Sequence, residues 1–328
     1  MKAAIVILNW NTLEYLRRFL PPLLESCEGR DAEVIVADNA STDGSVEMMA
    51  AEFPDVKVIE LEENFGFTGG YNRALESIDA EYYVLINSDI EVAPDWLDAL
   101  YRKMETCPEC GICGPKLLSF NDRGRFEYAG AAGGYIDYFG YPYCRGRILK
   151  RTEADCGQYD GEENVLWVSG ACLMIRSTLW RELGGFDSRF FAHMEEVDLC
   201  WRAQLRGFKV CCVPQSAVYH IGGGTLANGS AFKLRLNYRN NLLLLENNLP
   251  ECVGRFRARV RLFARMVLDG GSWCVYMATG QKEYARSVIQ AHREFRQLRH
   301  GFGERGGRAK IDGLCKGLIF VKYLKAKI

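Results

Sequence analysis

The hydrophobic positions of the first ninety residues alternate between short apolar runs and helical spacings. The apolar runs predict strands at residues 3–8, 33–39, 56–61 and 82–86. Between them, helical spacings predict a helix from Leu13 to about Cys27, a second helix after the capping segment STDGS at residues 41–45, and a third helix at about residues 71–77. Two βαβ units in succession predict a parallel sheet with right-handed crossovers, so residues 1–89 are expected to form a half-domain of the nucleotide-binding type.

The pattern is less regular after residue 89, but it still predicts an α/β protein. The expected elements are a helix at 96–104, strands at 111–120, 165–176 and 208–213, a short helix at 179–183, a helix at 195–207, and a wholly helical chain from Phe232 onward. Residues 122–161 have poor periodicity and are rich in Gly, Tyr and Arg. They predict a long loop or a small antiparallel excursion, and long loops in compact domains are often functional.

The octet YYVLINSD at residues 82–89 ends a buried strand on Asn87, Ser88 and Asp89. In an open α/β sheet, ligands bind outside the carboxyl ends of the strands. A divalent cation on a diphosphate takes one or two protein carboxylates and keeps its other positions for water and phosphate oxygens, so a single Asp at a strand end fits such a site. The same residues also suit a turn and a helix N-cap, and the octet alone favours that interpretation.

Charge is unevenly distributed along the chain. The 328 residues have a formal net charge of −1, but residues from 251 onward contain 17 Lys and Arg against 6 Asp and Glu, and the preceding part contains 24 against 36. A basic tail on an acidic body predicts an anionic partner, for which a membrane surface and a nucleic acid both qualify by charge. No apolar run reaches about 18 residues, so no membrane-spanning segment is expected.

The 13 cysteines are scattered singly through predicted strands and helices, which is typical of buried small side chains in a reducing compartment. The segment CPECGIC at residues 107–113 could suggest zinc, but structural zinc needs four ligands and no second CxxC or HxxxH completes the set. No charged, apolar leader opens the chain, because MKAAIVILNWN passes quickly into polar sequence. A cytoplasmic location is therefore expected.

Two further strand ends carry polar residues. Asp38 ends a predicted strand and Asp43 opens a predicted helix, where it suits either an N-cap or a ligand contact. The glycine fingerprint of dinucleotide-binding folds is absent after the first strand, where the sequence reads LNWNTLEYL, so NAD binding is not expected. Three glycines in NFGFTGGYNRAL at residues 64–75 would let backbone approach a ligand closely.

Acidic residues and a histidine complete the candidate chemistry. Glu195, Glu196 and Asp198 begin a predicted helix, where carboxylates either interact favourably with the helix dipole or act as a general base on a hydroxyl. His220 follows a predicted strand and precedes three glycines, which places it near the carboxyl edge of the sheet.

Seven segments, taken together, resemble the ordered motifs of family 2 glycosyltransferases with the GT-A fold. They are AIVILNWN, VIVADNASTDGS, ENFGFTGGYNRAL, YYVLINSD, VSGACLMIR, FDSRFFAHMEEVDLCWR and YHIGGGT, and they cover about residues 3–241. The similarity is closest to bacterial rhamnosyltransferase-like enzymes of surface polysaccharide synthesis. It implies a catalytic domain at residues 1–248, with a Rossmann-like, mostly parallel sheet, followed by a basic helical region at residues 249–328.

The resemblance also implies roles for single residues. Asp89 takes the place of the last Asp in the family's DxD motif, whose first position is here Asn87, and His220 matches the histidine that assists the metal or the diphosphate. Glu196 occupies the position of the catalytic Asp in the family's Glu-Asp-Val-Asp order, with Glu195 as the alternative base. The implied nucleotide-sugar contacts are Asn9, Asp38, Asn39, Asp43, Asn64, Gly66, Gly69, Gly70, Asn72, Asn87, Ser88, Gly170 and Arg239.

The implied reaction is a single displacement that inverts the anomeric carbon, with Mg²⁺ or Mn²⁺ on Asp89 and a proton transfer to Glu196. The implied donor is a UDP- or dTDP-sugar, and the implied acceptor is a glycan or lipid-linked hydroxyl in capsule, O-antigen or related polysaccharide assembly. Two other hypotheses stay open. A sugar nucleotidyltransferase would need a Gly-rich basic loop after the first strand, where Asn9, Trp10 and Asn11 stand, and a non-catalytic carbohydrate-binding module would need neither Asp89 nor the glutamate pair.

The C-terminal region supports two interpretations. Residues 255–267 and 313–328 could form basic amphipathic surfaces beside lipid-linked acceptors, which would make the protein peripheral on the inner face of the cell membrane. Alternatively, they form a solvated basic face packed on the catalytic domain. No nucleic-acid partner is expected, and the oligomeric state is open.

Overall fold

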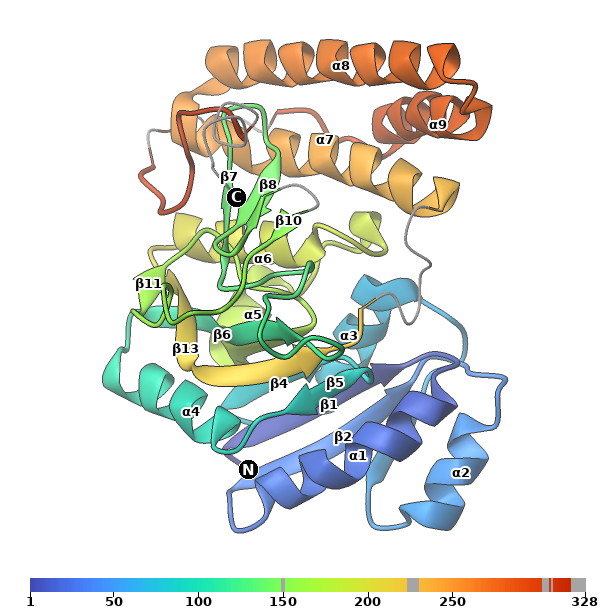
Figure 1. Cartoon of the computed structure of the whole chain (residues 1–328), viewed down its shortest axis with the longest axis vertical. Coiled ribbons are helices and arrows are strands. Elements are labelled where there is room, and N and C mark those ends of the chain that lie inside the picture. The colour runs from blue at the N-terminus through green and yellow to red at the C-terminus, as the bar shows by residue number, and fades with distance from the viewer. Residues whose placement is uncertain (149–150, 223–229, 303–306, 308, 320–328) are drawn as a thin grey trace.

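A mixed sheet forms the centre of the molecule (Figure 1). The computed structural model describes residues 1–148, 151–222, 230–302, 307 and 309–319. The hydrogen-bonded order of strands is β11 (Glu163–Asn164), β13 (Lys209–His220), β6 (Cys110–Ser119), β12 (Cys172–Arg176), β4 (Tyr82–Ile86), β1 (Ala3–Asn9), β2 (Ala32–Asp38) and β3 (Lys57–Glu60), while β5 (Ile90–Val92) pairs with β13. The strands β4, β1, β2 and β3 are parallel, as the two βαβ units predicted, and β12 runs antiparallel to β4 and β6.

Helices cover both faces of this sheet. One face carries α1 (Leu13–Cys27), α2 (Ser45–Glu52) and α4 (Trp96–Thr106), and the other carries α3 (Gly66–Glu76), α5 (Ser177–Leu183) and α6 (Glu195–Leu205). The apolar run of β1 serves both cores, because side chains alternate along a strand: Val6 faces the α3 side and Ile5 faces the α1 side.

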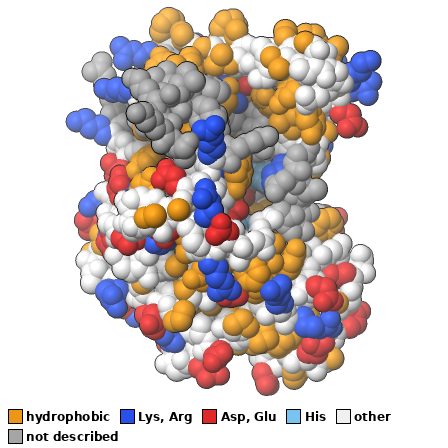
Figure 2. Space-filling view, viewed as in Figure 1, with side chains coloured by type: hydrophobic (Ala, Val, Ile, Leu, Met, Phe, Trp, Pro, Cys, Tyr) orange, Lys and Arg blue, Asp and Glu red, His pale blue; other side chains and the backbone are white. Residues whose placement is uncertain are grey.

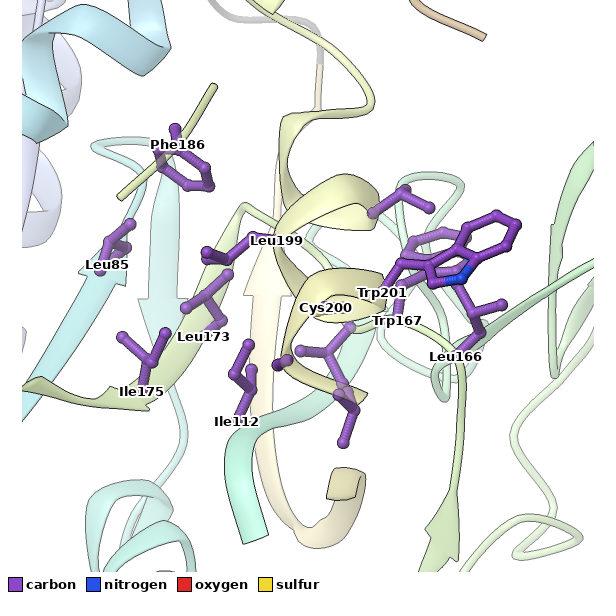
Figure 3. Close-up of a cluster of buried hydrophobic side chains, with 14 of the residues drawn as sticks. Leu85, Ile112, Leu166, Trp167, Leu173, Ile175, Phe186, Leu199, Cys200 and Trp201 are labelled. Atoms are coloured by element: carbon purple, nitrogen blue, oxygen red, sulfur yellow. The ribbon is translucent and has the colours of Figure 1, made fainter. Parts of the chain in front are cut away.

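A cluster of large buried side chains fixes α6 on the sheet (Figure 3). Leu199 and Trp201 of α6 are fully buried. Leu199 lies beside Leu173 of β12, and Trp201 lies beside Trp167 and Leu166 of the segment before β12. Close packing of this kind leaves a helix little freedom to shift. The N-terminus of α6 is therefore held in one position relative to the strands.

The irregular middle of the chain forms a small antiparallel sheet, as predicted for residues 122–161. Its strands are β7 (Gly134–Ile136), β8 (Pro142–Cys144), β9 (Arg147–Ile148) and β10 (Arg151–Thr152). A bridge between Gly134 and Trp167 joins it to the segment that precedes β12.

Three long helices follow the sheet: α7 (Ala231–Val253), α8 (Arg255–Ala278) and α9 (Lys282–Leu298). Helix α7 contacts α6 on one side and both α8 and α9 on the other, and α8 is the outermost element at the top of Figure 1. The expected domain boundary at residue 248 falls inside α7. No helix in the described part of the chain is long and apolar enough to cross a membrane.

Four sequence-based expectations about elements are wrong. Helix α3 begins at Gly66, about five residues before the expected start, and residues 165–171 are not a strand. Strand β13 is longer than expected and includes His220. The chain is not wholly helical after Phe232, because residues 309–318 return without forming a helix, and Cys315 N donates to Ile136 O in β7 (2.8 Å).

Candidate active site

A cavity of about 430 Å³ lies at the carboxyl ends of β1, β2 and β4. The predicted site residues that line it are Asn39, Asn64, Gly66, Asn87, Ser88, Asp89, Gly170, Glu195, Glu196 and His220. Residues that the sequence did not single out also line it, among them Trp10, Glu127, Tyr128, His193, Phe232 and Lys233. The cavity therefore collects residues from both the nucleotide-binding half and the C-terminal half of the chain.

A buried polar network fixes the strand ends beneath this cavity. Asp38 accepts hydrogen bonds from Asn9 Nδ2 (2.7 Å) and Ser41 N (2.9 Å). The Thr12 hydroxyl lies 2.5 Å from Asn9 Oδ1 and 2.8 Å from Ser88 Oγ. Asn9 and Asp38 were predicted nucleotide contacts, but neither lines the cavity, and their side chains connect β1, β2 and the turn after β4.

Asn39 organises the start of α3 beside the cavity. Its Nδ2 donates to Asn64 Oδ1 (2.9 Å) and Gly66 O (3.1 Å), and its Oδ1 accepts from Phe65 N (3.0 Å). Gly66 has a φ of +70°, and a Cβ there would lie 2.5 Å from the ring of Phe191. Only glycine meets both demands, so Gly66 allows the segment before α6 to approach α3 closely.

His220 lies between two carboxylates at the end of β13. Its Nε2 is 3.2 Å from Asp89 Oδ1, and its Nδ1 is 3.4 Å from Glu127 Oε2. Burial lowers the pKa of His220, but hydrogen bonds to Asp89 and Glu127 outweigh burial and raise the pKa to about 10. Burial raises the pKa of Asp89, and the hydrogen bond from His220 reverses this, so that the Asp89 pKa lies below its ordinary value.

Glu127 is a residue that sequence analysis missed. It belongs to the irregular segment 122–161, where neither a motif nor a strand end marks it. Its carboxylate is 8% exposed and also accepts a hydrogen bond from the Ala129 backbone N–H. Glu127 reaches the site because the antiparallel segment folds over the central sheet. That packing joins residues far apart in the sequence, so a local pattern does not reveal it.

Glu195 and Glu196 begin α6 and line the same cavity. Burial raises the pKa of Glu196 to about 7, and burial together with the charge of Glu196 raises the pKa of Glu195 well above its ordinary value. The Oε2 atom of each carboxyl group is buried without a hydrogen-bond partner in the protein. Such an oxygen favours a ligand or water as its partner.

The turn before α6 is strained and is held by α7. Phe191, His193 and Met194 all have positive φ, between 62° and 72°. Asn240 Nδ2 contacts three carbonyls of this turn, those of Phe190 (2.9 Å), Ala192 (2.8 Å) and His193 (2.7 Å). Helix α7 therefore fixes the conformation of the turn that leads into α6, where the two glutamates lie.

Residues 4–180 match the family model described as glycosyl transferase family 2. This match covers more than half of the chain. The chain belongs to glycosyl transferase family 2.

Known relatives of this family 2 glycosyltransferase are themselves glycosyltransferases or glycan biosynthesis proteins. The N-acetylglucosaminyl-diphospho-decaprenol L-rhamnosyltransferase of Mycobacterium tuberculosis is 27% identical over 261 residues, which cover 74% of this chain and 83% of the relative. The O-antigen biosynthesis protein RfbC of Myxococcus xanthus is 28% identical over 67% of this chain, although the match covers only 17% of RfbC. The expected resemblance to rhamnosyltransferase-like enzymes of surface polysaccharide synthesis is confirmed.

Solved structures confirm the GT-A fold. The mannosyltransferase PcManGT of Pyrobaculum calidifontis, in complex with GDP-Man and Mn²⁺, has a TM-score of 0.55 and 16% identity, and the match covers 90% of this chain and 86% of that chain. Staphylococcus aureus TarS 1–349, in complex with UDP-GlcNAc, has a TM-score of 0.56 and 16% identity, and the match covers 89% of this chain and 81% of that chain. At these identities the likeness shows the fold alone.

Besides Asn9 and Asp38, five further predicted contacts of the glycosyltransferase do not line the cavity, because packing or hydrogen bonding uses them elsewhere. Asp43 accepts from Leu13 N (2.9 Å) of α1 and Ser45 N (3.1 Å) of α2, and the N-cap position of α2 is Gly44. Asn72 exchanges hydrogen bonds of 2.9 Å with the backbone of Phe186. The remaining three are Gly69, whose Cβ position faces Phe65, Gly70, whose Cβ position faces Leu8, and Arg239, which donates to the carbonyls of Arg189 and Phe190.

The metal-ligating groups at Asp89 suit a divalent cation that takes some of its ligands from the protein and others from a phosphate. Asp89 supplies a carboxylate and His220 an imidazole, while no group of three or more His, Cys, Asp and Glu forms a metal site among the residues that the structure describes. Mg²⁺ and Mn²⁺ bound to diphosphates accept few protein ligands, so this small set fits them better than it fits a structural metal.

Proposed function

We propose that this glycosyltransferase inverts the anomeric carbon of a nucleotide-diphosphate sugar while transferring the sugar to an acceptor hydroxyl. The observation that supports this most directly is the Glu196 carboxylate. It has a raised pKa and a buried oxygen without a protein partner, in the same cavity as the Asp89–His220 pair. A base and a diphosphate site that share one cavity are what a single displacement requires.

Glu196 is the proposed general base, and Glu195 is the neighbouring carboxyl group whose pKa is also raised. With a pKa of about 7, the Glu196 carboxyl is partly ionised at neutral pH and can accept the proton of an attacking hydroxyl. Glu195 is 5% exposed, and its pKa is raised further by the charge of Glu196. Buried carboxyl groups with raised pKa values are typical of an acid–base site.

Asp89 and His220 are the proposed ligands of Mg²⁺ or Mn²⁺. When bound, such a cation would supply positive charge to the departing nucleoside diphosphate. Asn39, Asn64 and Gly66 line the part of the cavity next to β2 and α3, where we place the nucleotide. Asn87, Ser88 and Gly170 complete the proposed donor contacts.

The proposed donor is a UDP- or dTDP-sugar and the proposed acceptor is a lipid-linked sugar or glycan of a surface polysaccharide. The names of the relatives, which include a rhamnosyltransferase acting on a decaprenol diphosphate and an O-antigen protein, support this class of acceptor. A lipid-linked acceptor would bring the protein, from the cytoplasm, to the inner face of the membrane. The basic C-terminal region supports such a contact.

The test is a donor hydrolysis screen across UDP-, dTDP- and GDP-sugars with Mg²⁺ or Mn²⁺. Asp89→Ala and Glu196→Ala are each expected to lower the rate by about 10²–10⁴-fold, because one removes a metal ligand and the other the base. Asp55→Ala is the matched control, since Asp55 is an exposed carboxylate between α2 and β3 and does not line the cavity. If both cavity variants kept the rate of the Asp55→Ala protein, the proposed site would be wrong.

A further inference from the structure

Helix α8 exposes a stripe of large apolar side chains. Phe256 is 78% exposed, Val260 51%, Phe263 68% and Val267 58%. These positions are four, three and four residues apart, so they lie on one face of the helix. We define them as the α8 stripe. Figure 2 shows hydrophobic side chains gathered along the outer edge that α8 forms.

The opposite face of α8 carries its buried charges. Ala258, Leu262, Arg265 and Asp269 are buried toward the rest of the molecule. Arg265 Nε donates to Asp269 Oδ1 (2.8 Å), and His292 Nε2 of α9 lies 3.2 Å from Asp269 Oδ2. A solvated surface helix has apolar residues inside and charges outside. Helix α8 has the reverse arrangement around Arg265 and Asp269.

Exposed arginines flank the stripe. Arg255, Arg257 and Arg259 are exposed in the first turns of α8, and the helix contains one acidic residue, Asp269, which is 0% exposed. The helical repeat places Arg257 on one side of the stripe and Arg259 on the other. Arginine side chains beside an apolar face can keep their guanidinium groups in a polar headgroup layer while their methylenes follow the apolar surface.

A second feature of this part of the molecule is a groove between α8 and α9. This groove has a volume of about 320 Å³, and Met266, Trp273 and Ile289 line it together with Arg293 and Arg296. Ile289 is 42% exposed. Apolar contact area and positive charge therefore also occur together where α8 and α9 meet.

We infer that the α8 stripe docks the protein on a bilayer surface that contains anionic lipids. Exposed aromatic and aliphatic side chains flanked by arginines match such a surface in both hydrophobicity and charge. A second copy of the chain fits less well, because a two-fold contact through α8 would bring its exposed arginines against one another without an exposed acidic residue on the helix. The inference deepens the proposed function, since a lipid-linked acceptor requires the enzyme at a membrane.

The test is flotation of the full-length protein with vesicles, without nucleotide, metal or acceptor. Binding to vesicles of phosphatidylglycerol and phosphatidylcholine is expected, with much weaker binding to phosphatidylcholine alone. Phe256→Ser together with Phe263→Ser is expected to weaken binding at least about 10-fold through lost apolar contact, and Arg257→Glu about 10-fold through charge. Both phenylalanines are exposed, so the folded protein keeps its core.

Matched controls test the stripe itself. Val275 is 59% exposed on the same helix but lies off the stripe, so Val260→Ser should weaken binding and Val275→Ser should not. Lys57→Glu, at the exposed edge strand β3, makes the same charge change as Arg257→Glu and should leave binding unchanged. Equal losses for Val260→Ser and Val275→Ser, or equal binding to both kinds of vesicle, would overturn the inference.

Two further outcomes separate the alternatives. If the Phe256→Ser/Phe263→Ser protein changed from dimer to monomer in light scattering while the unaltered protein ignored vesicles, the stripe would be a contact between copies. The Asp89→Ala protein should float as the unaltered protein does, and the stripe variants should keep donor hydrolysis. Failure of docking is therefore measured separately from failure of the proposed reaction.

Discussion

The two adjacent glutamates at the start of α6 both have raised pKa values. A raised pKa means that a carboxyl is protonated over a wider range of pH, and only the ionised form accepts a proton. Burial raises the pKa of Glu196 to about 7, and burial together with the charge of Glu196 raises that of Glu195. We expect kcat/KM to rise with pH up to about 7 and then to level off. A pH–rate profile of the free enzyme measures this limb.

Glutamine variants show which of the two glutamates produces the acidic limb of the pH–rate profile. Glu196→Gln should remove nearly all activity, by about 10²–10⁴-fold, because an amide cannot accept the proton. Glu195→Gln should keep most of the activity and keep the acidic limb, because it preserves the size of a protonated Glu195. A Glu195→Gln protein that lost both would make Glu195 the base, which is the alternative that the sequence left open.

Glu127 should control the affinity of the site for a divalent cation. Its carboxylate faces His220 Nδ1, so it favours a proton on that nitrogen and leaves Nε2 directed toward Asp89. Glu127→Gln is expected to weaken Mn²⁺ binding by about 10–100-fold in the presence of UDP. The electron paramagnetic resonance signal of free Mn²⁺ gives the affinity without any turnover.

A control is available in the same antiparallel excursion. Glu153 also accepts a side-chain hydrogen bond, from the Tyr159 hydroxyl (3.0 Å), but does not line the cavity. Glu153→Gln should leave Mn²⁺ affinity unchanged. If Glu127→Gln lowered only the melting temperature and left the affinity as it was, Glu127 would have a structural role alone.

At the residue scale, the ordered motifs identified residues that the structure brings together. Asp89, His220 and Glu196 line one cavity, as the ordered motifs implied. Glu127 could not be predicted, because its position depends on how an irregular segment folds over β13. Asp43 and Arg239 show a different limitation. A motif position does not reveal that the side chain already makes a hydrogen bond within the protein, as Asp43 does with Leu13 N and Arg239 with Phe190 O.

At the scale of elements, the strained turn before α6 depends on α7. The amide of Asn240 supplies hydrogen bonds to three carbonyls of that turn, and without it those buried groups would lose their partner. Asn240→Ala is expected to lower the free energy of unfolding by about 1–3 kcal/mol. It should also lower kcat by about 10²-fold, because a displacement of about 1 Å at the glutamates is costly. Denaturant unfolding and steady-state kinetics measure the two effects.

The next residue provides the matched control. Asn241 is equally buried on α7, but its Nδ2 donates to Gly140 O and its Oδ1 accepts from Arg265. Asn241→Ala should lower stability by a similar amount while kcat per folded molecule stays near that of the unaltered protein. Equal losses of kcat in both variants would mean that the turn itself is not what α7 controls.

Element boundaries were predictable where periodicity dominates and not where packing overrides propensity. The apolar runs of β1, β2 and β4 predicted those strands, because a strand buried on both faces must be continuously apolar. The glycines of residues 66–70 predicted a loop, since glycine has low helix propensity. They lie inside α3 instead. Close packing explains why these helical positions are glycines, because a Cβ at Gly66 or Gly70 would come within 3 Å of Phe191 or Leu8.

At the scale of the whole molecule, the C-terminal helices are part of the same packed body as the catalytic sheet. Helix α7 lies between α6 and the pair α8 and α9, and Phe295 of α9 is fully buried. Arg299 pairs with the buried Glu246, and Ile136 N of the antiparallel sheet donates to Gly313 O (3.0 Å). Composition alone suggested a separate basic region. The charge of a segment does not show which apolar faces pack together, so this packing could not be predicted from it.

Removal of α9 and the segment after it should therefore destabilise the catalytic part. A chain ending at Gly280 is expected to melt at least several degrees lower than the full chain and to lose donor hydrolysis, because α7 would lose α9, one of the two helices that cover its outer face. Phe295→Ala shows how much α9 packing contributes, since replacing a buried phenylalanine by alanine lowers the free energy of unfolding by about 3–5 kcal/mol. Gln290→Ala, at an exposed position of α9, should lower it by less than about 0.5 kcal/mol. Calorimetry of the four proteins measures these differences. A shortened chain with an unchanged melting temperature would instead make the region from residue 249 an independent domain, as its composition suggested.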